Sequence, residues 1–359
     1  MAMMRRTVRI ASPLNSVKLE PVTAFLTEYG RCVNHFIEMY WSERNFDDVY
    51  VDSAHMPAER RFALTARLIQ CAGRQALQIV KSQRMKPKRQ RTMPRFTAMV
   101  AELDGRFWSI ADERNSFEWV KVQSGFTFML PFKKTEMWNR WADAGFTLSK
   151  SVRLLIRGDN LYIDFIFEKD APGHRTGGTV MGMDSGYIDM AVCSDGQVAG
   201  KGTSDFIRSF DRREKHTHRQ VEQKAFGELR KLDLSGVKTL VIEDLHSVKS
   251  RTRGMFPRAH NRRLSHWLYA REAEWLEQRC EEQGIELRRV SPWKTSQFCR
   301  FCGKWDRRSR NGKMFRCVHC GHTDDADMNG AQNIRLLGLA GVYSLRSLPN
   351  EFAGGNICL

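Results

Sequence analysis

The chain has 359 residues, more than one compact core usually organises, so we expect at least two domains. Lys and Arg outnumber Asp and Glu by 58 to 41, and the resulting formal charge of +17 favours a polyanionic partner over a small acidic metabolite. No apolar run approaches the roughly 20 residues of a membrane span, and residues 1–9 contain no apolar stretch of signal-peptide length. The sequence therefore predicts a cytoplasmic protein that binds nucleic acid, although a ribosomal or chromatin-like protein would be equally basic.

The chain begins with a helical block. Apolar residues recur at helical spacing from Val22 to Tyr40 and again from Phe62 to Val80. The basic stretch that follows is interrupted by prolines, which favours an exposed loop. We expect this loop to contact RNA or DNA, with a merely solvated surface as the alternative. The residues concerned are Arg84, Lys86, Lys88, Arg89 and Arg91.

Short β segments follow between residues 106 and 170 and predict a small barrel or sheet. They are Phe107–Ile110, Phe117–Val122, Phe126–Phe132 and a hairpin over Val152–Phe167 that turns at Gly158-Asp159-Asn160. Val8 and Ile10 could join this sheet, which would make the helical block an insertion into it. Four tryptophans could stack on unpaired bases, but core packing is the better interpretation for most of them. They are Trp108, Trp119, Trp138 and Trp141.

The Gly-rich segment from Ala171 to Gly178 is typical of a linker into a second domain. Beyond it, strands and helices alternate, which predicts an α/β layout. The expected strands are Thr179–Met183, Met190–Cys193, Val237–Ile242 and Ile285–Val290, and the expected helices run from about Ser204 to Leu232 and from Arg262 to Gln283.

Three acidic residues occupy positions where an α/β chain can bring them together. Asp184 and Glu243 each end an apolar strand, and Asp327 opens a helix-like run. Strand ends and helix starts gather at one edge of such a sheet. Clustered carboxylates repel one another unless hard cations lie between them, and two Mg²⁺ ions held in this way can cleave a phosphodiester by in-line attack of water. We therefore expect a magnesium-dependent nuclease site, which Mn²⁺ can also fill, with Asp184 as the ligand shared by both ions.

Four of the nine cysteines form two CxxC pairs, Cys299 with Cys302 and Cys317 with Cys320. Two such pairs supply the four thiolates of a tetrahedral Zn²⁺ and leave no open position, so this zinc is expected to be structural. His319 and His322 are expected to be bystanders. Redox cysteines are the alternative that this paired spacing disfavours.

Further basic residues lie beside these motifs and are candidates for nucleic-acid contact. One group follows Glu243 and the other lies within the cysteine element. They are Lys249, Arg251 and Arg253 in the first group, and Arg307, Arg308 and Arg310 in the second.

From about Gly182 to Ile334 the sequence resembles the TnpB proteins of insertion sequences and their relatives, the compact type V CRISPR effectors. The resemblance rests on four motifs. They are Gly182-Met183-Asp184-Ser185-Gly186, Val241-Ile242-Glu243-Asp244-Leu245, Thr295-Ser296-Gln297-x-Cys299-x-x-Cys302-Gly303, and Asp327-x-Asn329-Gly330-Ala331-x-Asn333-Ile334. The family's catalytic acids and zinc ligands fall on the acids and cysteines named above.

The resemblance implies an RNA-guided DNA endonuclease of prokaryotic or phage origin. Its partners would be a guide RNA and a double-stranded DNA target next to a short flanking motif, and it would act as a monomer or as a dimer on one RNA. The implied fold is an oligonucleotide-binding-type (wedge-like) barrel with a helical recognition lobe, joined to an RNase H-like (RuvC-type) domain with a zinc-ribbon insert. The expected ranges are 1–14 and 104–172 for the barrel, 15–103 for the lobe, 178–292 and 322–345 for the RuvC-like domain, 293–321 for the zinc ribbon, and 346–359 for a tail.

Two departures from the family pattern affect the last motif. Gly330 stands where an alanine is commoner, and Asp325-Ala326-Asp327 replaces a frequent Asp-Arg-Asp. Neither departure removes a metal ligand. Two alternatives stay open: a guide-dependent DNA-binding repressor that does not cut, and an RNA-independent RuvC-like nuclease such as a junction-resolving enzyme.

Overall fold

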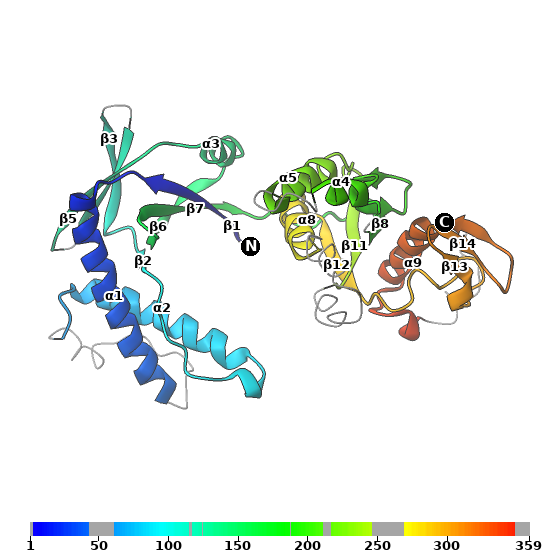
Figure 1. The fold of residues 1–359 in the computed structure, drawn as a ribbon, viewed down its shortest axis with the longest axis horizontal. Coiled ribbons are helices and arrows are strands. Elements are labelled where there is room, and N and C mark those ends of the chain that lie inside the picture. The colour runs from blue at the N-terminus through cyan, green and yellow to red at the C-terminus, as the bar shows by residue number, and fades with distance from the viewer. Residues whose placement is uncertain are drawn as a thin grey trace. The chain divides into compact units, whose positions relative to one another are not determined.

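The structure is a computed structural model (Figure 1). It describes residues 3–42, 61–114, 117–123, 125–186, 188–210, 217–245 and 269–348. The chain divides into two compact units, an N-terminal unit and a C-terminal unit, with the boundary between Asp170 and Ala171. None of the helices in the described ranges is both long and apolar enough to cross a membrane.

The N-terminal unit is built on a four-stranded antiparallel sheet. Its strands lie in the order β1 (Met3–Ser12), β7 (Asn160–Asp170), β6 (Thr147–Arg157) and β2 (Val100–Leu103). Every second side chain of β1 is buried, as expected for a strand with one face on a core. Val8 pairs with Phe165 and Ile10 with Ile163, so the prediction that the chain start joins this sheet is confirmed.

A second sheet holds β3 (Trp108–Arg114), β4 (Phe117–Gln123) and β5 (Thr127–Phe132), followed by helix α3 (Glu136–Asp143). The strands predicted here from alternating residues are confirmed, but the structure divides the β segments between two sheets. Trp138 and Trp141 of α3 are buried, which confirms core packing for these two tryptophans.

Two helices, α1 (Ser16–Ser42) and α2 (Ala66–Met85), lie in the chain between β1 and β2 and pack against each other. Helix α1 begins six residues before the apolar pattern because its first turn is mostly exposed and is capped by Asn15, whose side chain accepts a hydrogen bond from Lys18 N (3.0 Å). Helix α2 begins four residues later than predicted, since Thr65 is extended. The helical segment also ends earlier than expected, because residues 100–103 form β2.

The C-terminal unit contains a five-stranded sheet in the order β10-β9-β8-β11-β12. Strands β8, β11 and β12 are parallel, whereas β9 and β10 are joined by antiparallel ladders. The bounds are β8 Thr179–Ser185, β9 Ala191–Cys193, β10 Val198–Ala199, β11 Val237–Glu243 and β12 Glu286–Val290. The four strands predicted from apolar runs are thereby confirmed.

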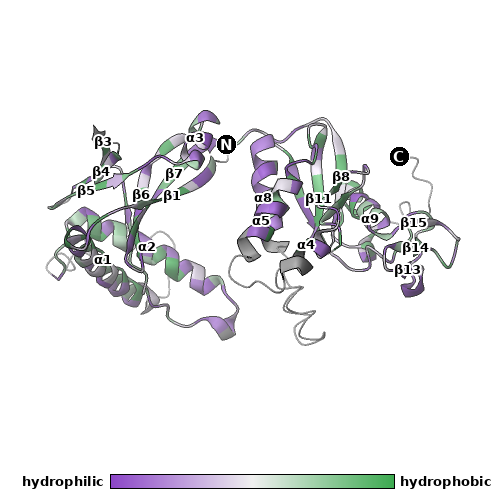
Figure 2. Cartoon of the chain, turned by 45° about the horizontal axis from the view of Figure 1, so that its top comes forward, coloured by the Kyte–Doolittle hydropathy of each residue, from purple (hydrophilic) through white to green (hydrophobic). Residues whose placement is uncertain are grey.

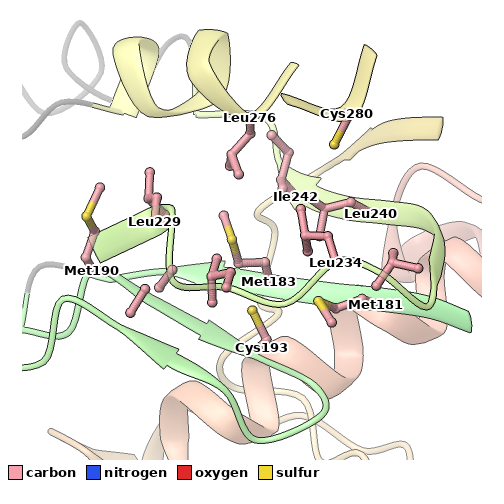
Figure 3. Packing of buried hydrophobic residues seen from close by; sticks show 14 of the residues in the cluster. Met181, Met183, Met190, Cys193, Leu229, Leu234, Leu240, Ile242, Leu276 and Cys280 are labelled. Carbon is pink, nitrogen blue, oxygen red and sulfur yellow. The ribbon is translucent and has the colours of Figure 1, made fainter. Parts of the chain in front are cut away.

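Helices cover both faces of this sheet. Helices α5 (Thr217–Leu229) and α8 (Tyr269–Gln283) pack on one face, where Leu276 lies over Met183 and Ile242 (Figure 3). Helix α9 (Ala326–Ala340) packs on the other face. Strands β8 and β11 carry hydrophobic colours in Figure 2, whereas the visible side of α8 is mostly hydrophilic.

Two predicted helices are described only in part. Helix α4 (Thr203–Phe210) and α5 cover most of the helix expected over Ser204–Leu232, and residues 211–216 lie outside the described residues. Helix α8 covers the last 15 residues of the helix expected over Arg262–Gln283, and residues 262–268 lie outside the described residues too.

The cysteine element lies in the chain between β12 and α9. It contains a short turn of 3-10 helix, η3 (Arg307–Ser309), and a three-stranded antiparallel sheet of β13 (Arg310–Asn311), β14 (Met314–Arg316) and β15 (Thr323–Asp325). The sheet continues four residues beyond the expected end at 321, since β15 leads directly into α9. A last turn of 3-10 helix, η4 (Leu345–Ser347), follows α9.

Candidate active site and metal centre

Asp184 and Glu243 lie side by side at the carboxyl ends of two neighbouring parallel strands. The last registered pair between β8 and β11 is Met183 with Ile242, and each acid follows directly. Met183 and Ile242 face the core under α8, so the next residue of each strand faces the opposite side, where α9 packs. The two carboxylates therefore share one face and one edge of the sheet.

The first turn of α9 brings Asp327 to the same place, because two glycines allow the helix to approach β8 closely. A Cβ added at Gly182 would lie 2.2 Å from the backbone oxygen of Ala331, and one at Gly330 would lie 2.5 Å from Asp184 Oδ2. Gly182 needs glycine because the added Cβ would meet backbone atoms of α9. At Gly330 the contact is with the end of the Asp184 side chain, so glycine there leaves room for the carboxylate in its present position.

The start of α9 is fixed by Asp325, whose side chain accepts hydrogen bonds from the backbone N–H groups of Asp327 (2.9 Å) and Met328 (3.1 Å). This is an N-cap, which satisfies donors that the first helical turn leaves free. Because β15 ends at Asp325, the cap also fixes where the cysteine element passes into the helix. Asp327 itself is buried, with 7% of its surface exposed.

The three carboxylates are close enough for their charges to act on one another. Burial raises the pKa of Asp184 well above its usual range, and the negative charges of Glu243 and Asp327 raise it further. Burial also raises the pKa values of Glu243 and Asp327, and in both cases the positive charge of Arg310 opposes the rise. Acids placed like this ionise together only when positive charge compensates them, and Arg310 and Lys313 supply part of that charge here.

Three side chains of the cysteine element contact these acids. Thr295 Oγ1 donates a hydrogen bond to Glu243 Oε1 (2.5 Å), and Arg310 Nη2 donates one to Asp327 Oδ1 (2.9 Å). Lys313 Nζ lies 3.9 Å from the other oxygen of Asp327. Glu243 and Asp327 are thus each oriented by a residue from outside the five-stranded sheet.

Two asparagines of α9 hold the start of the cysteine element against the helix. Asn333 Nδ2 donates to the backbone oxygens of Thr295 and Phe298 (both 2.7 Å), and Asn329 Nδ2 donates to Phe298 O (2.8 Å). Both asparagines are fully buried. Sequence reasoning included them in a motif without assigning a role, and the available signal was their spacing of four residues, which places both on one helix face.

The four cysteines form the second centre. Their sulfur atoms all lie within 4.8 Å of one another, with 3.7 Å between Cys299 and Cys320 and 3.6 Å between Cys302 and Cys317. A tetrahedron with Zn–S bonds of about 2.3 Å has S···S edges of about 3.8 Å, so the donor set fits zinc. The sulfur group predicted from the sequence is confirmed, and His319 and His322 lie outside it.

Within the described part of the chain, the cysteines are the one group of three or more metal-binding side chains whose donor atoms converge on a single point. The three carboxylates do not converge in this way. In this arrangement, the three acids do not all lie close enough together to bind one ion directly.

The basic residues predicted to bind nucleic acid have varied surroundings. Arg84 donates to the backbone oxygens of Tyr40 and Trp41 at the end of α1, so it stabilises that helix end. Arg308 pairs with Asp306 (2.9 Å), and Lys88 and Arg307 are exposed. Lys86 contacts Gln83, and Arg91 donates to Lys86 O. The side chain of Arg89 and the whole of Lys249, Arg251 and Arg253 lie outside the described residues.

Residues 269–334 match the family model of the Cas12f1-like TNB domain. The matched segment contains α8, β12, the cysteine element and the first half of α9. The four-sulfur group is consistent with a zinc-binding domain of this type.

Two curated relatives support this match over a limited part of the chain. The CRISPR-associated endodeoxyribonuclease Cas12f1 of Sulfoacidibacillus thermotolerans is 32% identical over 102 residues, which is 28% of this chain and 22% of the relative. A protein of the same description from an uncultured archaeon is 33% identical over 106 residues, 27% of this chain and 19% of the relative. The matches span about a fifth of these relatives, so they show distant homology to Cas12f1.

Among solved structures, CasPhi-2 (Cas12j) bound to crRNA matches over 96% of this chain and 99% of that one, with a TM-score of 0.52 and 7% identity. A Cas12f1 chain from an sgRNA and target DNA complex matches over 93% and 99%, with a TM-score of 0.48 and 13% identity. At these identities the likeness concerns the fold alone. The mixed α/β fold of this chain is thus similar to that of the Cas12j chain.

Proposed function

We propose that this protein is an RNA-guided DNA endonuclease that cleaves target DNA next to a short flanking motif by two-metal phosphodiester hydrolysis. The observation that carries the proposal is the meeting of Asp184, Glu243 and Asp327 at one edge of the β8–β11 sheet, beside a zinc element of Cas12f1-like type.

The fold supports a RuvC-type assignment of the C-terminal unit. Numbered along the chain, its strands lie in the order 3-2-1-4-5 with the second strand antiparallel to the first, as in RNase H-like domains. The cysteine element lies in the chain between β12 and α9. In the N-terminal unit, helices α1 and α2 interrupt a β structure between β1 and β2, which suits an oligonucleotide-binding-type barrel that carries a helical recognition lobe.

The carboxylates fit two hard cations better than one. Asp184 lies next to both other acids and would be the shared ligand, whereas Glu243 and Asp327 would each complete one ion. When bound, two Mg²⁺ ions activate the attacking water and stabilise the departing oxygen of a phosphodiester. Thr295 holds the Glu243 carboxylate in place, and Arg310 supplies positive charge where a phosphate has to approach.

A guide RNA and a double-stranded DNA target are the partners that this function requires. The net charge of +17 suits two polyanions, and the distant Cas12f1 relatives are CRISPR-associated endodeoxyribonucleases. Whether the chain acts in the manner of TnpB or of a CRISPR effector depends on the source of its guide. The matched relatives favour a type V-like effector.

The test is DNA cleavage by the protein with its RNA, with and without Asp184. Asp184→Ala should lower the cleavage rate by about 10³-fold or more, because a ligand of both ions is lost, while DNA binding persists. The matched control is Asp195→Asn, which alters an exposed aspartate in the turn between β9 and β10. Cleavage by Asp184→Ala at the wild-type rate would contradict the assignment, and tight DNA binding without cleavage by the wild type would indicate a guide-dependent repressor.

A further inference from the structure

The β13–β14 hairpin of the cysteine element, residues 310–316, is held to the rest of the C-terminal unit by two side chains. Arg310 on β13 bonds to Asp327, and Lys313, one residue before β14, forms an ion pair with Asp189. The backbone oxygen of Lys313 also accepts a hydrogen bond from Ala326 N (2.7 Å), immediately before Asp327. The position of this hairpin thus decides where the Arg310 guanidinium lies.

Asp189 comes from a different part of the chain, four residues after β8 ends at Ser185. It is buried, with 6% of its surface exposed, and both carboxylate oxygens have partners. Oδ1 accepts the backbone N–H of Gly202 (2.9 Å), and Oδ2 accepts the ammonium of Lys313. Asp189 therefore joins the loop that follows β8 to the 310–316 hairpin of the cysteine element.

Asp189 and Lys313 carry opposite charges, and this strengthens the contact between them. The Lys313 ammonium and the Gly202 N–H lower the pKa of Asp189, and the Asp189 carboxylate raises the pKa of Lys313, so both groups are ionised at neutral pH. A charge-assisted hydrogen bond to a buried carboxylate is stronger and more directional than a contact between two exposed side chains. The Asp189 side chain is 8% exposed, so salt screens this pair less than it screens a pair of two exposed side chains.

We propose that Asp189 is a positioning residue for the nuclease reaction: by anchoring Lys313 it holds the 310–316 hairpin so that Arg310 stays beside Asp327. The inference rests on the proposed function, since it concerns the same carboxylates. The negative charge of Asp189 also raises the pKa of Asp327, but its hydrogen bonds are to Gly202 and Lys313, so its positioning effect passes through the hairpin. Displacing a site residue by about 1 Å can lower a rate by about 100-fold, so loss of this anchor should be visible in catalysis.

The first experiment measures the hairpin directly, by hydrogen exchange of residues 310–316 in the full-length, zinc-loaded protein. Asp189→Asn keeps an oxygen for Gly202 N–H and removes the charge that holds Lys313. Exchange in the hairpin should become about 10-fold faster in Asp189→Asn and in Lys313→Met, with unchanged zinc content. Lys201→Gln is the matched control, because it removes an exposed positive charge near Asp189 without breaking the pair.

The second experiment measures DNA cleavage by the same variants with their RNA and Mg²⁺. Asp189→Asn and Lys313→Met should each lower kcat by about 10- to 100-fold while KM for DNA changes by less than about threefold. The double variant should lose no more than Lys313→Met alone, since both changes break the Asp189–Lys313 pair and only Lys313→Met also removes the contact with Asp327. Lys313→Arg, which can still reach Asp189, should restore most of the rate.

The outcomes separate this inference from the proposed function. Wild-type protein that cuts no DNA overturns the proposed function, and equal hairpin exchange in wild type and Asp189→Asn overturns the anchoring. If the wild type cuts and Asp189→Asn cuts equally fast, the positioning role is wrong. A double variant that loses the product of the two single effects also overturns it, because Asp189 and Lys313 would then act independently.

Discussion

Glu272 offers a prediction about stability that can be worked out from one buried carboxyl group. It lies on α8 with 2% of its surface exposed, on the sheet face opposite the candidate active site. Its Oε1 accepts a hydrogen bond from Ser185 Oγ (3.0 Å), and its Oε2 has no partner. Burial raises the pKa of Glu272 from 4.5 to about 8. The folded protein therefore keeps this group protonated at neutral pH, whereas the unfolded chain ionises it.

The sign of the effect follows from proton linkage. Between pH 4.5 and 8 the folded state binds the proton and the unfolded state releases it, so folding becomes less favourable as the pH rises through this window. At about 1.4 kcal/mol per pKa unit, the cost to folding is about 3 kcal/mol at pH 7 and under about 1 kcal/mol at pH 5. Glu272→Gln has almost the same shape, keeps an acceptor for Ser185, and has no such cost. It should stabilise the C-terminal unit by about 3 kcal/mol at pH 7.

The assay is hydrogen exchange of β8 and α8 in Glu272→Gln and in wild type at the two pH values. A difference of about 3 kcal/mol corresponds to exchange slower by about 100-fold or more at pH 7, and the difference should nearly disappear at pH 5. The control is Glu274→Gln, since Glu274 lies on the same helix with 56% of its side chain exposed and should change stability by less than about 0.5 kcal/mol. Equal exchange in both proteins at pH 7, or an equal gain at both pH values, would refute the reasoning.

Three further predictions concern the site. Gly182→Ala should destabilise the C-terminal unit by more than about 3 kcal/mol in urea unfolding, because the added Cβ would meet the backbone of Ala331. The control is Gly227→Ala in α5, where the added Cβ has no neighbour within 4 Å and should stabilise the unit by up to about 1 kcal/mol. Thr295→Val removes the hydrogen bond that lowers the pKa of Glu243, so the acidic limb of the pH profile for cleavage should move to higher pH. An unchanged pH profile would show that Thr295 does not influence the ionisation of Glu243. Removal of zinc with a chelator should abolish cleavage, and Zn²⁺ followed by Mg²⁺ should restore it, whereas recovery with Mg²⁺ alone would show that the cysteine element is not needed.

The positions of the predicted acids could be anticipated because they depend on local patterns. Asp184 and Glu243 follow apolar runs whose parallel pairing brings their ends together, and Asp327 follows an acidic cap that marks a helix start. The cysteine spacing is equally local, since a tetrahedral site needs two CxxC turns and little else. These features need no knowledge of how distant segments pack.

The residues that complete the site could not be anticipated in the same way. Thr295 reaches Glu243 across 52 residues of sequence, and Lys313 reaches Asp189 across 124. Such contacts arise only after the cysteine element has docked on α9. Glu272 shows the same limit, because it lies on a charged helix whose pattern gives no sign that one glutamate faces the core.

The boundaries of the elements were harder to predict than their existence. Helix α1 begins in an exposed turn that the buried apolar pattern does not include, and residues 100–103 form a short strand that only its partner β6 defines. The three-stranded sheet of the cysteine element likewise includes β15, which lies beyond the last of the four cysteines and is recognisable only from its pairing with β14. In each case the end of the element is set by a contact made elsewhere in the chain.

The measurement that tests the central claim most directly is cleavage by the complex purified with RNA expressed from its own locus. The bound RNA would be sequenced, and the complex would be incubated in Mg²⁺ with a plasmid library that carries the matching target between randomised flanks. The account predicts cuts at the target next to one flanking motif, and no cuts by the same complex carrying Asp184→Ala. Cutting that requires no RNA, or cutting that persists in Asp184→Ala, would contradict it.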